Sequence, residues 1–224
     1  MLRILLFCLL GQPLPALLIY MEDRKRMRAA LLLKALSSLY FVLLGFFLMK
    51  RCPDPRYARF IFAGLLFGLG GDVLLNLCHL IKENRLVFLA GGTLFLTGHI
   101  LYLLALLPAA GSLLRVFLYT LLLFLPLVLF VYWRTAEETV LRILALIYLL
   151  AVTLMTASAI SFFHEAPALY RARLIFPGAL LFLLSDTLLV KNMLNQNRFR
   201  WMRIVLLVFY YLGQTLIALS LGSS

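Results

Sequence analysis

Runs of about 20 apolar residues recur along the whole chain, separated by short breaks that carry charges, Pro or Gly. A helix needs about 20 such residues to cross the hydrocarbon core of a bilayer. With 64% hydrophobic and 13% charged residues, a chain of 224 residues cannot bury this much apolar surface inside one water-soluble core. We therefore expect an all-α, polytopic membrane protein with eight spanning helices, near residues 2–20, 29–49, 59–81, 86–107, 113–133, 140–163, 174–195 and 201–221.

The predicted spans leave no segment long enough for a separate soluble domain, so residues 1–224 are expected to form one integral membrane domain. The first segment begins like a signal peptide, but no small-residue cleavage site precedes its charged end. We interpret it as a retained helix with a kink at Pro13 and Pro15. The short loops and the lack of a retention signal favour a bacterial inner membrane.

The formal net charge of +12 raises the question of a nucleic-acid partner. However, the basic residues gather at predicted helix ends, as at Arg24, Lys50 and Arg198, which is typical of membrane proteins facing lipid head groups. Membrane lipids are thus the predicted partners, and nucleic acid is not. The three cysteines are scattered and lack C-x-x-C spacing, so no disulfide framework is predicted.

The chain contains an internal similarity. Aligning Asp72 with Asp186 brings GDVLLN onto SDTLLV and places Lys34 opposite Tyr148, while a shift of one further residue brings TGHILYLLAL onto LGQTLIALSL. Four helices per unit would make two parallel repeats, about 1–110 and 111–224, related by an axis along the membrane normal. The two aspartates would then lie at equivalent depths. A chance match between Leu-rich helices is the alternative.

Asp72 and Asp186 both lie deep within predicted spans, where an ionisable side chain costs roughly 3 kcal/mol and usually faces a partner or a cavity. Asn76 follows Asp72 by one helical turn, and Ser185 adjoins Asp186. Lys34 lies about five residues inside the N-terminal boundary of the second span. Its ammonium could therefore line the mouth of a cavity or simply snorkel to water.

Further polar residues lie in the fourth and eighth spans. His99 and Tyr102 share a helix face, and Tyr210, Tyr211 and Gln214 form a patch. For each of these side chains the alternative is an ordinary hydrogen bond between packed helices.

Two carboxyls in one site of low dielectric cannot both ionise cheaply, so one is expected to hold a proton while the other stays charged. This combination suits hydrolysis through an oxocarbenium-like state, aspartyl peptide hydrolysis or proton-coupled transport. Zinc chemistry needs three clustered ligands, and only His99 is a deep histidine. The chain has no G-x-S-x-G motif, and its aspartates lack the Y-D and G-x-G-D motifs of intramembrane proteases.

Several motifs together resemble the YhhN family of eight-helix membrane proteins, whose characterised members are lysoplasmalogenases. The resemblance covers about the second to the eighth span. The sequence departs from the family pattern at Ala35, often Pro, and at Gly98, often Ala, and neither change removes a reactive group. The matching elements are Lys34, GDVLL at 71–75, GHILY at 98–102, Tyr148, Met155, GALLFLLSD at 178–186, Asn192 and YLGQTLI at 211–217.

The resemblance implies hydrolysis of the vinyl-ether bond of a 1-alkenyl lysophospholipid to a fatty aldehyde and a glycerophospho-alcohol, with no metal or cofactor. One aspartate would protonate the alkenyl carbon, and the other would stabilise the cation and orient water. Asp72 is favoured as the acid. His99 and Tyr102 are expected to bond a carboxyl or the water, and Lys34 the phosphate. The predicted catalytic residues are Asp72, Asp186 and His99, and the predicted substrate-binding residues are Lys34, Asn76, Tyr102, Tyr148, Ser185, Asn192, Tyr211 and Gln214.

The alternative function is a proton-coupled transporter or lipid-binding membrane protein that uses the same aspartates. The oligomeric state stays open.

Overall fold

The computed structural model describes residues 6–7, 9–11, 13–24, 26–81, 84–132, 139–194 and 200–222. These residues form helices joined by short turns, and no strand occurs among them. The elements in chain order are α2 (Pro13–Asp23), α3 (Met27–Met49), α4 (Pro55–Leu80), α5 (Arg85–Leu106), η1 (Leu107–Ala109), α6 (Leu113–Tyr132), α7 (Thr139–Glu165), α8 (Tyr170–Leu194) and α9 (Arg200–Leu219).

Seven of the described helices, α3 to α9, are long and apolar enough to cross a membrane. Their bounds lie within a few residues of the seven predicted spans that begin with 29–49, which confirms an all-α protein with several membrane-spanning helices. The chain is therefore an integral membrane protein by the length and composition of its helices.

The predicted first span, 2–20, is not confirmed. Helix α2 begins at Pro13 and has 11 residues, or about 16 Å at the helical rise, roughly half the thickness of a hydrocarbon core. Proline is well suited to the first turn of a helix but interrupts a helix that would run through it. Residues 2–5, 8 and 12 of the predicted span lie outside the described residues.

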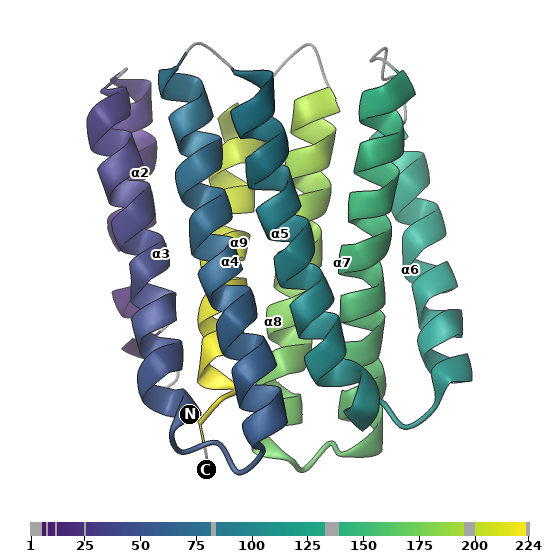
Figure 1. Ribbon diagram of the computed structural model, residues 1–224. Coiled ribbons are helices and arrows are strands. Elements are labelled where there is room, and N and C mark those ends of the chain that lie inside the picture. The colour runs from purple at the N-terminus through teal and green to yellow at the C-terminus, as the bar shows by residue number, and fades with distance from the viewer. Residues whose placement is uncertain are drawn as a thin grey trace.

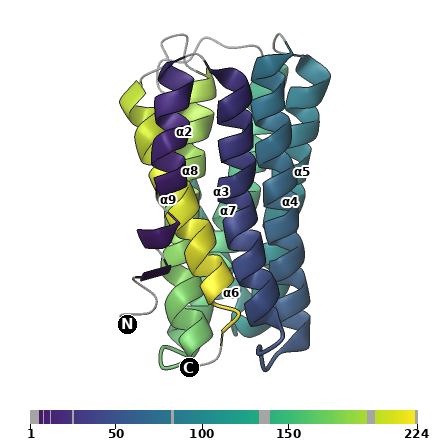
Figure 2. The ribbon, with the colours of Figure 1, turned by 90° about the vertical axis from the view of Figure 1, so that its left-hand side faces the viewer.

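The long helices stand side by side and alternate in direction along the chain. Figure 1 shows α2 and α3 at one end of the bundle, α7 and α6 at the other, and α4, α5, α8 and α9 between them. Helix α3 packs against α4 and α9, and α5 packs against α4 and α7. Seen from the α2 side, α9 runs beside α2 and α3 (Figure 2). The last helix of the chain thus lies next to its earliest helices.

Short capping motifs begin two of the spans. The Asp54 carboxylate accepts hydrogen bonds from the backbone N–H groups of Arg56 and Tyr57 at 3.1 and 3.0 Å, and Pro55 occupies the first position of α4. The Asn84 side chain accepts from Leu86 N–H at the start of α5 in the same way, at 2.9 Å. These caps satisfy backbone donors that have no partner within the first helical turn.

Two pairs of helices approach closely at glycines. A β-carbon on Gly98 would lie 3.3 Å from the carbonyl oxygen of Gly64, so α5 rests nearly on the backbone of α4. A β-carbon on Gly213 would lie 2.9 Å from the carbonyl oxygen of Gly178, and α9 meets α8 at least as tightly. Small residues commonly allow such contact between membrane helices.

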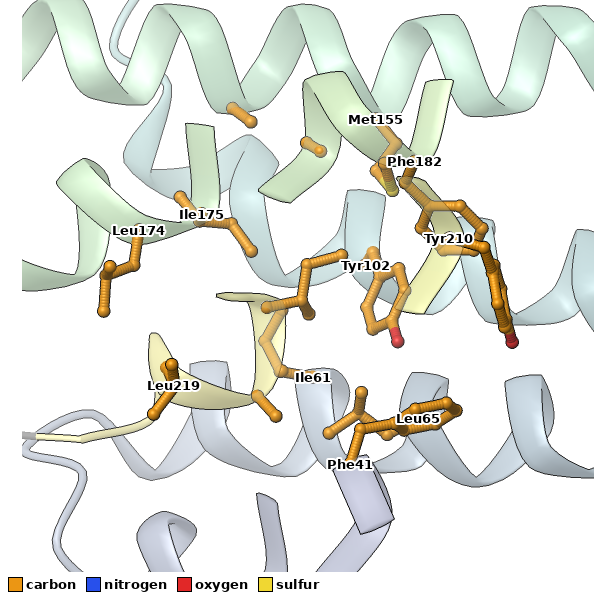
Figure 3. Packing of buried hydrophobic residues seen from close by; sticks show 14 of the residues in the cluster. Phe41, Ile61, Leu65, Tyr102, Met155, Leu174, Ile175, Phe182, Tyr210 and Leu219 are labelled. Carbon is orange, nitrogen blue, oxygen red and sulfur yellow. The ribbon is translucent and has the colours of Figure 1, made fainter. Parts of the chain in front are cut away.

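Aromatic side chains pack in the interior between these helix pairs. Phe182 of α8 contacts Tyr102 of α5 and Tyr210 of α9, with ring centroids 6.3 and 5.4 Å apart (Figure 3). Phe41 of α3 packs on the other side of Tyr210, at 6.2 Å. Four helices therefore meet around one aromatic cluster, and the two buried aspartates lie next to it.

Candidate functional site

Asp72 lies on α4 and is 2% exposed. The ammonium of Lys34 lies 3.3 Å from its Oδ1. The Ser38 and Tyr210 hydroxyls each donate a hydrogen bond of 2.6 Å to its Oδ2. A carboxylate without its proton can only accept hydrogen bonds, and here one cation and two hydroxyl donors from α3 and α9 point at it. These three groups can stabilise a negative charge on Asp72.

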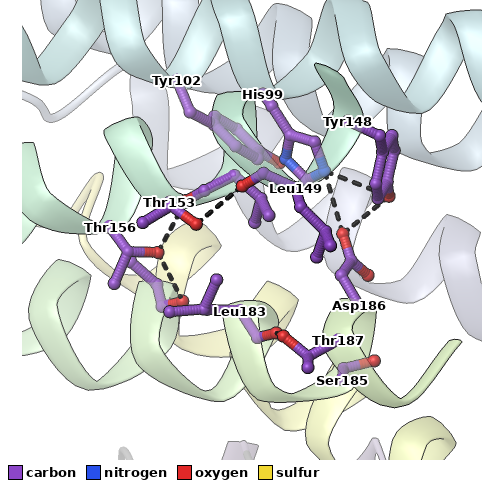
Figure 4. Close-up of polar contacts among 12 residues, drawn as sticks. His99, Tyr102, Tyr148, Leu149, Thr153, Thr156, Leu183, Ser185, Asp186 and Thr187 are labelled. Carbon is purple, nitrogen blue, oxygen red and sulfur yellow. Dashed lines mark hydrogen bonds and ion pairs between the residues drawn. The ribbon is translucent and has the colours of Figure 1, made fainter. Parts of the chain in front are cut away.

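Asp186 lies on α8 and is also 2% exposed, but its partners differ. Its Oδ2 lies 2.9 Å from His99 Nε2 and accepts a hydrogen bond of 2.6 Å from the Tyr148 hydroxyl. His99 Nε2 and the Tyr148 hydroxyl are 3.1 Å apart, so the three polar groups form a triangle (Figure 4). Among the ion pairs of the described residues, none joins Asp186 to a Lys or Arg.

The Asp186 triangle can exchange a proton within itself. Imidazole and carboxylate can each carry the proton of the bond between His99 and Asp186, and the tautomer of His99 decides which group donates. The other ring nitrogen, Nδ1, has no hydrogen-bond partner among the described residues. The arrangement can therefore deliver one proton to a bound molecule.

Phe182 connects the two carboxyl centres. Its ring lies 4.9 Å from the His99 ring and 5.4 Å from the Tyr210 ring, both measured between centroids. His99 bonds Asp186 and Tyr210 bonds Asp72, so one side chain contacts a partner of each aspartate. The two centres belong to a single packed region of the protein.

Both aspartates occupy the same position along their helices. Asp72 lies eight residues before Leu80 at the end of α4, and Asp186 lies eight residues before Leu194 at the end of α8. At the helical rise this is about 12 Å from that end. Since α4 and α8 run in the same direction (Figure 1), the carboxyls lie toward the same side of the bundle.

The amide side chains near the site are incompletely bonded. The Gln214 Oε1 accepts a hydrogen bond of 2.8 Å from the Tyr102 hydroxyl, while its Nε2 has no partner among the described residues. Asn76, one turn after Asp72, is 2% exposed, and neither atom of its amide is bonded to a described residue. The Tyr211 hydroxyl lies beside α3 without hydrogen-bond geometry to any described group. Such buried groups are available to a polar ligand or to water.

The structure specifies the partners of two predicted site residues. His99 bonds Asp186, because α5 packs against α7 and its histidine meets the α7 and α8 side chains. Tyr102 bonds Gln214 and not a carboxyl, because α5 also reaches α9 at this level.

Two predicted binding residues lie apart from these contacts. The Ser185 hydroxyl donates to the Leu206 carbonyl at 2.8 Å and so joins α8 to α9. Asn192 lies two residues before the end of α8, and its Oδ1 has no partner among the described residues.

Ser38 and Tyr210 were not among the predicted site residues, although both bond Asp72 directly. Helical spacing could have identified them, because Ser38 follows Lys34 by one turn and Tyr210 precedes Gln214 by one turn.

The portion of the chain that the structure describes contains no group of three or more His, Cys, Asp or Glu side chains able to hold a metal ion.

Comparison with known proteins gives one match. The model of the YhhN family matches residues 29–221, which include helices α4 to α9, all but the first two residues of α3, and all the contacts described for the two carboxyl centres. We find no match to this chain among curated proteins or among solved structures. The family match covers most of the chain and agrees with the resemblance seen in the sequence motifs. The chain therefore belongs to the YhhN family.

Proposed function

We propose that this protein is a lysoplasmalogenase-type hydrolase that cleaves the vinyl-ether bond of 1-alkenyl lysophospholipids within the membrane. The observation that carries the proposal is the pair of buried carboxyls in different environments, one beside a lysine and one beside a histidine. Membership of the YhhN family supports a hydrolase of this type. The products would be a fatty aldehyde and a glycerophospho-alcohol.

The different partners suggest different roles for the two aspartates. Asp72 has a cation and two hydroxyl donors, which can stabilise a negative charge on its carboxyl group. Asp186 forms hydrogen bonds with His99 and with the Tyr148 hydroxyl. We therefore assign the proton donor to the centre formed by Asp186 and His99, and the stabilisation of positive charge to Asp72. This assignment reverses the preference for Asp72 as the acid that the sequence suggested.

The reaction needs a proton at carbon and then a water molecule. Protonation of the alkenyl carbon next to the ether-bearing carbon gives an oxocarbenium ion. Water adds to that ion, and the protonated hemiacetal that forms loses one proton to a nearby base. The neutral hemiacetal then collapses to the aldehyde: the base gives this proton to the leaving glycerol oxygen, and the hydroxyl proton returns to the acid. An ionised Asp72 near the oxocarbenium ion would lower the energy of this charged intermediate in a site of low dielectric.

Lys34 can serve both the carboxylate and the substrate. Its ammonium has three donor protons, and the contact with Asp72 at 3.3 Å uses one of them. The side chain is 11% exposed, so part of it remains accessible. We propose that it also contacts the substrate phosphate, while the alkenyl chain lies between the two halves of the bundle.

We further propose that the two centres descend from an internal repeat. Lys34 and Tyr148 each precede their bonded aspartate by 38 residues, one on α3 and the other on α7. Each aspartate is also bonded from a helix of the other half, Asp72 from α9 and Asp186 from α5. The close glycine contacts of α4 with α5 and of α8 with α9 are a second correspondence.

The test is incubation of the purified protein with lysoplasmalogen, followed by detection of fatty aldehyde. Asp72→Asn and Asp186→Asn should each abolish aldehyde release while substrate binding remains measurable. Asp54→Asn is the matched control, because Asp54 lies at the far end of α4 from Asp72 and asparagine can also cap a helix, so losing this carboxylate and its ion pair with Arg171 should leave aldehyde release unchanged even where stability falls. Equal aldehyde release by all four proteins would refute the assigned site.

A wild-type protein that releases no aldehyde would refute the function. Proton-driven flux of unmodified lipid or solute through reconstituted vesicles would then favour the transporter.

The inner membrane of a bacterium is the cellular location that we propose for the protein.

A further inference from the structure

The two carboxyl centres lie much closer to one end of the bundle than to the other. Asp72 is eight residues from the last residue of α4 but 17 residues from Pro55 at its start, or about 12 and 26 Å at the helical rise. Asp186 lies at nearly the same depth on α8, 16 residues after Tyr170. We call the end of the bundle where α4 and α8 finish the near end, and the opposite end the far end.

The interior between the aspartates and the far end is tightly packed. The close helix contacts at Gly64 and Gly178 lie eight residues, or about 12 Å, before the aspartate of the same helix. Large apolar side chains fill the space among the helices there (Figure 3). Those that are at most 1% exposed include Ile61 and Leu65 of α4, Leu106 of α5 and Ile175 of α8. A lipid would have to separate these packed helices to reach the carboxyls from the far end.

Polar contacts also join the helices at the far end. The guanidinium of Arg171, at the start of α8, lies 3.2 Å from Asp54 Oδ2 and 5.2 Å from the centroid of the Tyr57 ring. The Tyr57 hydroxyl oxygen lies 2.6 Å from Ser220 Oγ, directly after α9. These contacts connect α4 with α8 and with the end of α9, so they hold the two halves of the chain together at this end.

The near end is less enclosed. In α9 and the turn after it, residues 213–222 are buried at every position except Leu216, whereas most residues of the near part, 201–209, are partly or fully exposed. The cation of the Asp72 centre also belongs to the near end, because Lys34 lies seven residues after Met27 at the start of α3 and its side chain keeps 11% of its exposure. The near end therefore offers both the shorter path and a charge suited to a phosphate.

We propose that the site is open to one face of the membrane only. Lysophospholipid enters from the leaflet at the near end, and the glycerophospho-alcohol returns to the water on that same side, while the fatty aldehyde stays in the membrane. This inference rests on the proposed hydrolase function and adds the leaflet that supplies its substrate.

The chemistry of the substrate fits this direction of entry. The glycerol carbons separate the phosphate from the vinyl-ether bond, so a phosphate held by Lys34 places the bond deeper in the bundle, toward Asp72 and Asp186. Entry from the far end would carry a charged head group through the packed apolar interior, which is costly.

Reconstitution with a known orientation tests the proposal. Arg26→Cys places a thiol at the near end and Lys50→Cys places one at the far end, both at exposed positions, in a protein whose three native cysteines are replaced by alanine. Each variant is inserted into vesicles that carry at most one protein. A membrane-impermeant biotin maleimide, followed by streptavidin, then captures the vesicles whose engineered thiol faces outward.

Lysoplasmalogen is supplied either to the outer leaflet alone or to both leaflets. Its charged head group crosses hydrocarbon slowly, because burying the charge is costly, so the substrate stays in its leaflet during a short assay. With outer-leaflet substrate, vesicles captured through Arg26→Cys should release aldehyde and also glycerophospho-alcohol into the outer medium. Vesicles captured through Lys50→Cys should release neither. Substrate in both leaflets should restore hydrolysis in the latter, with the glycerophospho-alcohol retained inside.

Arg85→Cys, at another exposed position of the near end, repeats the test if the label on Arg26→Cys slows the reaction. Hydrolysis of outer-leaflet substrate by both populations, or only by vesicles captured through Lys50→Cys, would overturn access from the near end and leave the hydrolase function standing. Absence of aldehyde from wild-type protein with substrate in both leaflets would overturn the hydrolase function, and this inference with it.

Discussion

The contact between Lys34 and Asp72 should stabilise the fold measurably, and a double-mutant cycle can isolate its contribution. The two charges are 3.3 Å apart, with side chains 11% and 2% exposed. Coulomb's law with an effective dielectric constant of 20 sets an upper limit of about 5 kcal/mol. Polar contacts measured by such cycles within a membrane protein reach only about 1.7 kcal/mol, because the unfolded chain in the membrane finds other partners.

We expect a coupling free energy of about 2 kcal/mol, between these limits and closer to the lower one. Lys34 lies seven residues from the start of α3, or about 10 Å, so its ammonium can reach water once Asp72 is neutral. Lys34→Met should therefore cost more than Asp72→Asn, since it leaves a buried carboxylate without its cation. The double variant should be less destabilised than the sum of the single variants predicts.

The measurement is the free energy of unfolding of all four proteins in detergent micelles, obtained by titration with a denaturing detergent and followed by circular dichroism. Lys50→Met serves as a control, because Lys50 lies in the turn after α3 and is exposed. Additivity within about 0.5 kcal/mol would refute the reasoning, because independent sites usually add within that margin.

Three further changes test other parts of the structure. Gly213→Ala should reduce the free energy of unfolding by about 1–3 kcal/mol, because its β-carbon would lie 2.9 Å from an α8 carbonyl oxygen, and thermal unfolding measures the loss. The backbone N–H of Tyr57 holds the pKa of Asp54 below its ordinary value of 3.8, so Asp54 stabilises the fold above that pH and loses the effect as pH falls through its lower folded pKa. The Tm difference between wild type and Asp54→Asn should accordingly be present near neutral pH and close in acid. Tyr148→Phe removes a hydroxyl bonded to Asp186 and should lower aldehyde release by about 10²-fold with Tm little changed, whereas an unchanged rate would exclude Tyr148 from the proton-donating centre.

The seven confirmed spans could be predicted to within a few residues, because a bilayer imposes one length on every apolar helix and each helix satisfies its own backbone. The first predicted span is not among the confirmed ones, because α2 has 11 residues and several positions before it lie outside the described residues. Apolar composition shows that a segment prefers lipid, and helix continuity depends on individual residues as well.

The polar residues of the site were largely recognisable, since an ionisable group deep in a span is costly and stands out from its neighbours. Asp72, Asp186, His99 and Lys34 all lie at the two buried centres. Ser185 shows the limit of this reasoning, because its hydroxyl bonds the Leu206 carbonyl of α9 and so joins two helices.

The assignment of partners to each aspartate depended on helix packing. Periodicity within one helix places Asn76 on the face of Asp72 but does not indicate which other helices face that side. Helix α9 brings Tyr210 to Asp72, and α5 brings His99 to Asp186, through contacts between segments 138 and 87 residues apart in the chain. Membrane helices associate through small residues and shape, which single-helix patterns do not encode, so only the packed bundle distinguishes the lysine-bound carboxyl from the histidine-bound one.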